Sequence, residues 1–221
     1  MSRFAGQADR LLGSFAPEHA TPPAHSASFR IAFICTGNIC RSAYAQQTFS
    51  ALISSSRFSG QIEAFSAGTH ALAGQPIDPH PGAIFTREFG QLPTHRAQQL
   101  TTELVAQAEL LLVMEAQQRQ IVLRRYPQAL PRTFLLTEYV GICRELAGAI
   151  SAPGPAGAAL SARLGELTAR AARHRSLGAE APDIADPYRH DTAFHEKVAG
   201  QIRSQLDLLM SILDSIAQDP S

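Results

Sequence analysis

The sequence predicts an α/β protein: a single three-layer α/β/α domain built around a four-stranded parallel sheet. Short apolar runs of strand length alternate along the chain with segments of helical periodicity. A turn of small and polar residues ends the first apolar run and leads directly into a helical segment. The chain has 221 residues, which is enough for one sizeable core.

The expected strands and helices follow one another in alternation. The first strand covers residues 29–35, and the next helix runs from Ala43 to about Ser54. Thr101 or Thr102 is expected to cap the third helix. The carboxyl ends of parallel strands meet at one edge, so we expect Cys35 and Ser66 there. The remaining strands are expected at 61–66, 110–114 and 132–136, and the remaining helices at 82–89, 101–108, 115–126, from 137 onward, and at 192–217.

Two segments lie outside this pattern. Residues 1–28 are expected to form an N-terminal extension, a short amphipathic helix plus a linker, which packs on its own domain rather than docking a partner. Residues 29–221 form the main domain, with a helical insert at about 141–180. We interpret the arginines of this insert as a solvated face rather than a partner site. Cys143 is expected to be structural.

Composition limits the class of protein. Charged residues make up 17% of the chain and the formal net charge is zero, so neither a nucleic-acid nor a membrane partner is expected. No apolar run reaches the length of a membrane span, and the N-terminus lacks the apolar core of a signal peptide. Three cysteines, two of them in one loop, do not make a secreted disulfide framework. We therefore expect a cytoplasmic protein.

The loop from Cys35 to Ser42 has the composition of a phosphate cradle with a nucleophile at its base. Cys35 ends a strand and faces a helix N-terminus and Arg41, all of which favour the thiolate. The guanidinium of Arg41 matches two oxygens of a phosphate. Gly37 is expected to take a positive φ, with Asn38 as the next best residue for it. The Ser42 hydroxyl is placed to donate to the thiolate.

This loop resembles the phosphate loop of the low-molecular-weight protein tyrosine phosphatases. The resemblance extends over roughly residues 29–217, interrupted at about 141–180, and implies a flavodoxin-like fold and phosphotyrosine protein phosphatase activity. Inorganic phosphate or sulfate is then expected to be able to occupy the loop. No cofactor is implied, and no cluster of His, Cys and Asp shows metal-ligand spacing, so no metal is expected. The other matching stretches are 65–69, 74–79, 94–99 and 186–188.

The resemblance also implies roles for residues. Cys35 would attack phosphorus and form a phosphocysteine, while Asp186 would act as general acid and then as general base. The residues alone leave Asp183 and Asp191 as equal candidates for that acid. Phosphate would be held by the loop residues Thr36, Gly37, Asn38, Ile39, Cys40, Arg41 and Ser42.

Further roles concern the surroundings of the loop. Asn38 would be supported by Ser66 and His95, in a network that also includes Ser42. Ile39 and Tyr188 would line the rim and suit an aromatic leaving group, which favours a phosphotyrosine-containing protein as substrate. Cys40 would be a redox element that forms a disulfide with Cys35 under mild oxidation.

Three departures from the family pattern accompany the resemblance. Ala43 and Gln46 stand where relatives usually carry Pro and an acidic residue, and Arg189 follows Tyr188. Two alternatives stay open. A thiol-dependent arsenate reductase shares the loop, but its relay needs two further cysteines and only Cys143 lies outside the loop. A phosphate-binding module without turnover would not need Asp186.

Overall fold

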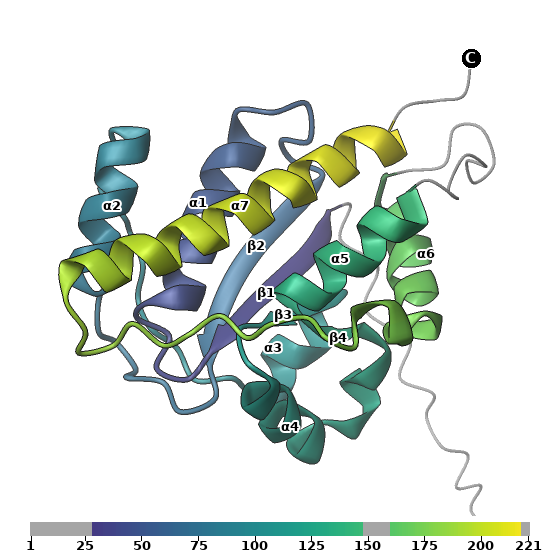
Figure 1. Ribbon diagram of the computed structural model, residues 1–221, viewed down its shortest axis with the longest axis horizontal. Helices are drawn as coiled ribbons and strands as arrows, with labels where there is room; N and C mark the ends of the chain where they lie inside the picture. The colour runs from purple at the N-terminus through teal and green to yellow at the C-terminus, as the bar shows by residue number, and fades with distance from the viewer. Residues whose placement is uncertain (1–27, 148–159, 218–221) are drawn as a thin grey trace, which may run out of the picture.

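The computed structural model describes residues 28–147 and 160–217 (Figure 1). The helix expected within residues 1–28 therefore lies, apart from Ser28, outside the described residues. None of the described helices combines the length and the apolar character needed to cross a membrane.

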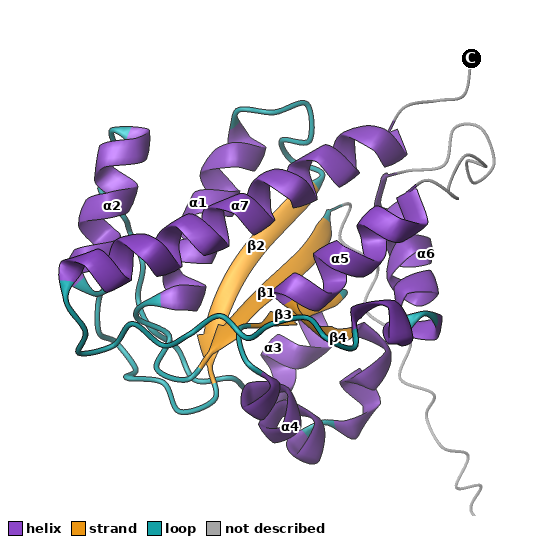
Figure 2. Ribbon diagram, viewed as in Figure 1, coloured by secondary structure: helices purple, strands orange, loops and turns teal. Residues whose placement is uncertain are grey.

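The sheet has the predicted four parallel strands. β1 (Phe29–Cys35) is central, with β2 (Ile62–Gly68) on one side and β3 (Leu110–Val113) on the other, and β4 (Thr133–Leu135) lies outside β3. Cys35 pairs with Gly68 and Ile34 with Val113, so three strands end at the same edge. Figure 2 shows the loops gathered at that edge. The predicted fold class is confirmed.

Side chains of β1 alternate between two apolar clusters, as the pleat of a strand requires. Phe29, Ile31 and Phe33 pack into the larger cluster, whereas Ala32 and Ile34 pack into the smaller one. Both faces of the sheet are therefore buried. Because side chains on either face need an apolar environment, the strands are continuous apolar runs in the sequence.

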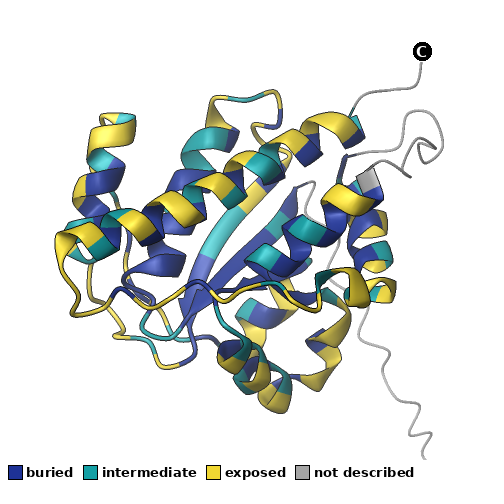
Figure 3. Ribbon diagram, in the orientation of Figure 1, coloured by how far each residue is buried: buried dark blue, intermediate teal, exposed yellow. Residues whose placement is uncertain are grey.

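Helices cover the two faces unequally. The larger cluster is built with α1 (Arg41–Ser54), α2 (Pro79–Phe89), α5 (Leu136–Ala147), α6 (Leu160–Arg173) and α7 (Thr192–Ala217). The smaller cluster is built with α3 (Thr102–Gln107), α4 (Ala116–Arg125) and the 3₁₀ segment η1 (Pro127–Arg132), and a second 3₁₀ segment, η2 (Arg175–Gly178), follows α6. Buried and exposed positions alternate along α7 in Figure 3, as expected for an amphipathic helix.

One helix begins earlier than the sequence pattern predicts. The expectation for α2 was a start at Gly82, but the helix begins at Pro79. Asp78 caps it, because its Oδ1 accepts a hydrogen bond from the backbone N–H of His80 at 3.0 Å. Proline at the first helical position has no N–H to leave unpaired, so the Pro-rich stretch starts the helix instead of preventing it.

Much of the segment around 141–180 belongs to the core. Residues 141–147 lie in α5, and Cys143 is fully buried there. The α6 helix buries Leu164 and Leu167 against the domain, and the Tyr139 hydroxyl lies 3.1 Å from that of Thr168.

The expectation of a solvated arginine face is wrong for Arg175. Its guanidinium lies 4.0 Å from the ring centroid of Phe134 and donates to the carbonyl oxygens of Leu130 and Thr133. A Glu138 carboxylate also lies 3.3 Å away. Arg175, the first residue of the 3₁₀ segment η2, is therefore a packing residue that joins this segment to β4 and α5.

Candidate active site

The loop between β1 and α1 is held by the chain that follows β2. The backbone N–H groups of Thr69, His70 and Leu72 donate to the carbonyl oxygens of residues 35, 36 and 37 at 2.9–3.0 Å. A Cβ on Gly68 would lie 2.4 Å from the Thr36 carbonyl oxygen, so glycine is required for this close approach. The loop is thus fastened to the sheet edge through its backbone.

The left-handed residue of the loop is Asn38, with φ of 57°. The expectation that Gly37 takes a positive φ is wrong, because Gly37 is not among the described residues with that conformation. Asparagine tolerates this region when its side chain is held locally. The cost of this backbone conformation is offset by hydrogen bonds to both the oxygen and the nitrogen of the Asn38 side-chain amide.

The Asn38 side chain is the centre of a buried network. Its Oδ1 accepts from the backbone N–H of Gln98 at 2.8 Å, which fixes the orientation of the amide. Its Nδ2 then donates to the hydroxyl oxygens of Ser42 and Ser66, both at 2.9 Å. The Ser66 hydroxyl in turn donates to Gln46 Oε1 at 2.9 Å. Gln46, a departure from the family pattern, is therefore an acceptor within the network.

The Cys35 sulfur is buried at one end of this network. The Ser42 Oγ lies 2.9 Å from it, and the backbone N–H of Asn38 points at it from 3.3 Å. Because Asn38 already donates to the Ser42 oxygen, the Ser42 hydroxyl hydrogen is available to the sulfur. Two donors that converge on one sulfur stabilise its thiolate form.

His95 supports the loop from another side. Its Nε2 lies 2.6 Å from the Asn38 carbonyl oxygen, and since a carbonyl only accepts, Nε2 carries the hydrogen. Burial lowers the pKa of His95, opposed by this bond. The structure thus brings together Asn38, Ser66 and His95, although His95 reaches the backbone of Asn38 rather than its side chain.

Arg41 is buried, and its guanidinium is oriented by three acceptors. Nη1 donates to Glu115 Oε1 at 2.6 Å and to the Ile184 carbonyl oxygen at 2.9 Å, while Nη2 lies 3.0 Å from Asp186 Oδ2. Within the described part of the chain Nε has no hydrogen-bond partner. A buried donor without a partner is unusual, so the Nε edge of Arg41 is free to bind an anion.

Asp186 lies in the long loop before α7 and, unlike Asp183 and Asp191, forms an ion pair with Arg41. Its side chain is 47% exposed, and its Oδ1 accepts from the backbone N–H of Tyr188 at 3.2 Å. Asp183 instead accepts from the N–H of Ala116, and Asp191 accepts from the N–H of Phe194 at the start of α7. The structure therefore distinguishes Asp186 from the two alternatives.

Several residues of the site were not predicted from the sequence. Glu115 caps α4 and reaches Arg41, and Gln118 donates to Thr36 Oγ1 at 3.2 Å and to Glu115 Oε2 at 3.1 Å. Glu115 follows two residues after β3, so its place at the carboxyl edge was a usable signal. The backbone contributions of Gln98 and Ile184 carry no such signal, because any residue has the same N–H and C=O.

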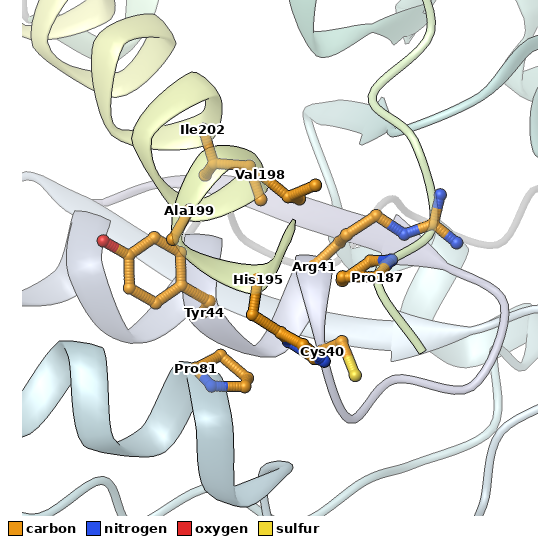
Figure 4. Close-up of a pocket in the computed structure, with 9 residues that line it drawn as sticks. All are labelled: Cys40, Arg41, Tyr44, Pro81, Pro187, His195, Val198, Ala199 and Ile202. Atoms are coloured by element: carbon orange, nitrogen blue, oxygen red, sulfur yellow. The ribbon is translucent and has the colours of Figure 1, made fainter. Parts of the chain in front are cut away.

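The two residues predicted to line the rim, Ile39 and Tyr188, differ in exposure. Ile39 is buried together with Cys40 and Ala97, while Tyr188 is 42% exposed with the Arg189 guanidinium over its ring. Cys40 also lines a small recess between the loop and α7, shared with Pro187 and His195 (Figure 4). Burial raises the pKa of the Cys40 thiol well above its ordinary value, with a smaller contribution from Asp78.

Comparison with known proteins agrees with this geometry. The family model of the low molecular weight phosphotyrosine protein phosphatases matches residues 30–173. The chain is 35% identical over 167 residues to a probable low molecular weight protein-tyrosine-phosphatase, EpsP, of Ralstonia nicotianae, covering 75% of this chain and 83% of the relative. It is 34% identical to a protein-arginine-phosphatase of Geobacillus stearothermophilus, over 51% of this chain and 72% of that protein.

Solved structures share the fold. The low molecular weight protein tyrosine phosphatase of T. tengcongensis superposes with a TM-score of 0.60 at 25% identity, covering 83% of this chain and 99% of that one. The arginine phosphatase YwlE of G. stearothermophilus gives 0.63 at 21% identity, covering 87% and 99%. Together with the family match and the EpsP relative, these findings show that the chain belongs to the low-molecular-weight phosphotyrosine protein phosphatase family, a family of hydrolases.

Proposed function

We propose that this protein is a phosphotyrosine protein phosphatase that hydrolyses aryl phosphomonoesters through a phosphocysteine on Cys35. The observation that carries the proposal is the convergence of donors on the Cys35 sulfur, with Ser42 Oγ at 2.9 Å and the Asn38 N–H at 3.3 Å. These donors stabilise the thiolate that attacks phosphorus, and they stabilise it again as the leaving group when water cleaves the thiophosphate.

Arg41 and the loop backbone hold the phosphoryl group in this proposal. The backbone N–H groups of residues 36–42 would bind the phosphoryl oxygens, since the loop leads into the start of α1, where the helix dipole favours an anion. The Nε edge of Arg41 adds two hydrogen bonds in a fixed plane, because Glu115 and Ile184 hold the opposite edge. These contacts strengthen as charge builds on the equatorial oxygens in the transition state.

Asp186 serves as the general acid and then as the general base. Its carboxyl lies at the mouth of the loop, 3.0 Å from Arg41, and is partly open to solvent. In the first step it gives a proton to the leaving phenolate. In the second step it takes a proton from the water that attacks the phosphocysteine, and phosphate and the free thiolate are released.

Ile39 and Tyr188 favour a phosphotyrosine-containing protein as substrate. An apolar residue and an exposed aromatic ring at the rim suit a flat aromatic leaving group. Some relatives are named protein-arginine-phosphatases, so phosphoarginine is the competing substrate class. A guanidinium leaving group is planar but cationic, and the Arg189 guanidinium over Tyr188 would repel it at this rim.

We also propose that Cys40 forms a disulfide with Cys35 once Cys35 is oxidised to the sulfenic acid, with water as the by-product. The raised pKa of Cys40 leaves it largely protonated, so the bond should form slowly. Three free thiols are compatible with a reducing cytoplasm. Mass spectrometry after mild peroxide should find a linked Cys35–Cys40 peptide, and detection of Cys35 sulfinic acid without that link would overturn this part.

Two other functions are less compatible with the site. An arsenate reductase needs a relay of further thiols, but Cys143 is fully buried in α5, where burial raises its pKa to about 12. A binding module without turnover would not need Asp186, because Glu115 already orients Arg41 and the Asp186 carboxylate is half exposed beside it.

The first test compares the intact protein with Cys35→Ser in the hydrolysis of a small aryl phosphate. We expect turnover by the intact protein, loss of turnover in the variant, and a phosphorylated Cys35 trapped by rapid acid quenching. Matched peptides carrying phosphotyrosine or phosphoarginine then decide the substrate class, and preference for phosphoarginine would overturn the assignment to phosphotyrosine. Residual turnover in folded Cys35→Ser would exclude the phosphocysteine route.

A further inference from the structure

A cluster of metal-ligating side chains lies beside the active site. Asp78 precedes α2, His80 is in the first turn of α2, and His195 is in the first turn of α7. One potential ligand atom of each residue lies within 4.8 Å of the others. The spacing of these residues in the sequence gives no sign of the cluster, because the fold joins positions that are 115 residues apart.

His195 is the buried member of this cluster. The residue is 97% buried, since its exposed fraction is 3%, yet within the described residues no hydrogen bond engages either ring nitrogen. Its ring stacks on that of His80, with ring centroids 4.5 Å apart and planes inclined by 26°. Neither ring nitrogen is among the fully buried side-chain atoms of the described residues that lack a partner, so the edge of the ring stays accessible beside the recess that Cys40 and Pro187 line.

We propose that Asp78, His80 and His195 bind a divalent transition-metal ion, with zinc as the preferred ion. Two imidazoles and one carboxylate form a donor set that zinc uses in proteins, with water completing the tetrahedron. Bonds of about 2.0–2.1 Å place tetrahedral ligand atoms about 3.3 Å apart. The partly exposed side chains of Asp78 and His80 close this gap by small rotations toward buried His195.

Neighbouring groups already orient two of the ligands. His80 Nδ1 lies 3.3 Å from the Thr192 hydroxyl, which leaves Nε2 for the ion, as is usual for histidines that bind metal. Asp78 Oδ1 is occupied by the cap of α2, which leaves Oδ2. The ion would tie α2 to α7 next to the recess that Pro187 and Cys40 also line. The site is therefore adjacent to the loop of Asp186 without being part of the phosphate cradle.

The test is calorimetric titration of the tag-free full-length protein with zinc, run in the Cys35→Ser background so that the nucleophilic thiol contributes no ligand. We expect one zinc ion per chain, a rise in melting temperature with zinc, and no comparable response to magnesium, which prefers oxygen ligands. Asp78→Asn keeps the helix cap and His80→Gln is partly exposed, so both variants should fold. Each should lose about 100-fold or more in affinity, since even the partners of metal ligands contribute about 10- to 100-fold.

The matched control is His70→Gln, an exposed histidine outside the cluster, which should bind zinc like the parent. Zinc binding that survives in both Asp78→Asn and His80→Gln would overturn the proposal, and so would the absence of binding in the Cys35→Ser parent. Calorimetry does not depend on turnover, so failure of this proposal and failure of the proposed phosphatase activity are separate results.

Discussion

The two halves of the candidate active site are built in opposite ways. The phosphate loop is buried, and Cys35, Asn38 and Ser42 are joined by hydrogen bonds that continue into β2. The loop before α7 is mostly exposed (Figure 3). Between residues 181 and 191 the buried residues are Ile184 and Pro187. The proposed nucleophile is therefore pre-organised by the core, whereas the proposed general acid lies on a surface segment.

Arg41 is the joint between these halves. Its guanidinium belongs to α1 but contacts Glu115 after β3, and Ile184 and Asp186 in the exposed loop. The Ile184 N–H also donates to the Met114 carbonyl oxygen at 2.8 Å. The exposed loop is thus attached to the site at Ile184, two residues before the proposed general acid, Asp186.

The largest effect should come from Arg41→Lys. Lysine cannot present two coplanar donors to phosphate while it also donates to Glu115 and Ile184. The substitution therefore removes both phosphate binding by this side chain and its contact with the exposed loop. Each donor toward a developing charge is worth about 10²–10³ in rate, so kcat should fall roughly 10⁴-fold or more. Steady-state kinetics with an aryl phosphate measure this effect. The control is Arg170→Lys in α6, and a comparable loss there would show that the effect is not specific to the joint.

A smaller effect should follow from Asp186→Asn. Loss of a general acid typically costs about 10²–10⁴ in rate, and the cost should shrink for leaving groups that need no proton. Kinetics with a series of aryl phosphates of different leaving-group pKa measure this dependence. The melting temperature should not change, because the residue is exposed.

The matched control for Asp186 is Asp191→Asn in the same loop, where asparagine keeps the cap of α7. If Asp191→Asn lowered the rate as much as Asp186→Asn, the contact with Arg41 would not identify Asp186 as the general acid. An Asp186→Asn enzyme with a uniform loss for all leaving groups would show that the carboxylate positions Arg41 rather than donating a proton.

In the buried half, Asn38→Gly should lower stability as well as activity. Glycine adopts a φ of 57° without strain, so the variant removes the side-chain bonds alone. Buried donors and acceptors left without partners cost about 1–3 kcal/mol of unfolding free energy. Urea denaturation measures this change. Gln46→Glu, which keeps an acceptor for Ser66, should leave stability close to that of the parent, and an equal loss there would show that the network is not the cause.

Local patterns predicted the buried half well and the exposed half poorly. A strand, a short loop and a helix of adjacent residues place Cys35, Arg41 and Ser42 together, so their sequence spacing carries the geometry. The loop of Asp186 has no periodicity, and Asp183, Asp186 and Asp191 are equivalent until tertiary contacts separate them. Long-range packing, not local chemistry, makes that distinction.

The same reason explains the errors within the predicted half. Gly37 was the natural choice for a positive φ by residue type, but the Asn38 conformation is stabilised by the N–H of Gln98, which comes from a distant segment. Composition predicts that Arg175 is a solvated charge, yet its guanidinium packs on the Phe134 ring. Side-chain partners far along the chain override the local preference in both cases.

The smallest effect concerns pH and again separates the two halves. Burial lowers the pKa of His95 below its ordinary value, so the unfolded chain takes up a proton first as the pH falls. The stabilisation is therefore present above about pH 6.5 and is lost as the pH drops through the folded-state pKa, with a slope of at most about 1.4 kcal/mol per pH unit. His95→Gln should flatten this part of the pH dependence of unfolding, as measured by urea denaturation at a series of pH values. An unchanged slope in His95→Gln would show that support of the Asn38 carbonyl is not linked to protonation, and that the buried half is as insensitive to acid as the exposed one.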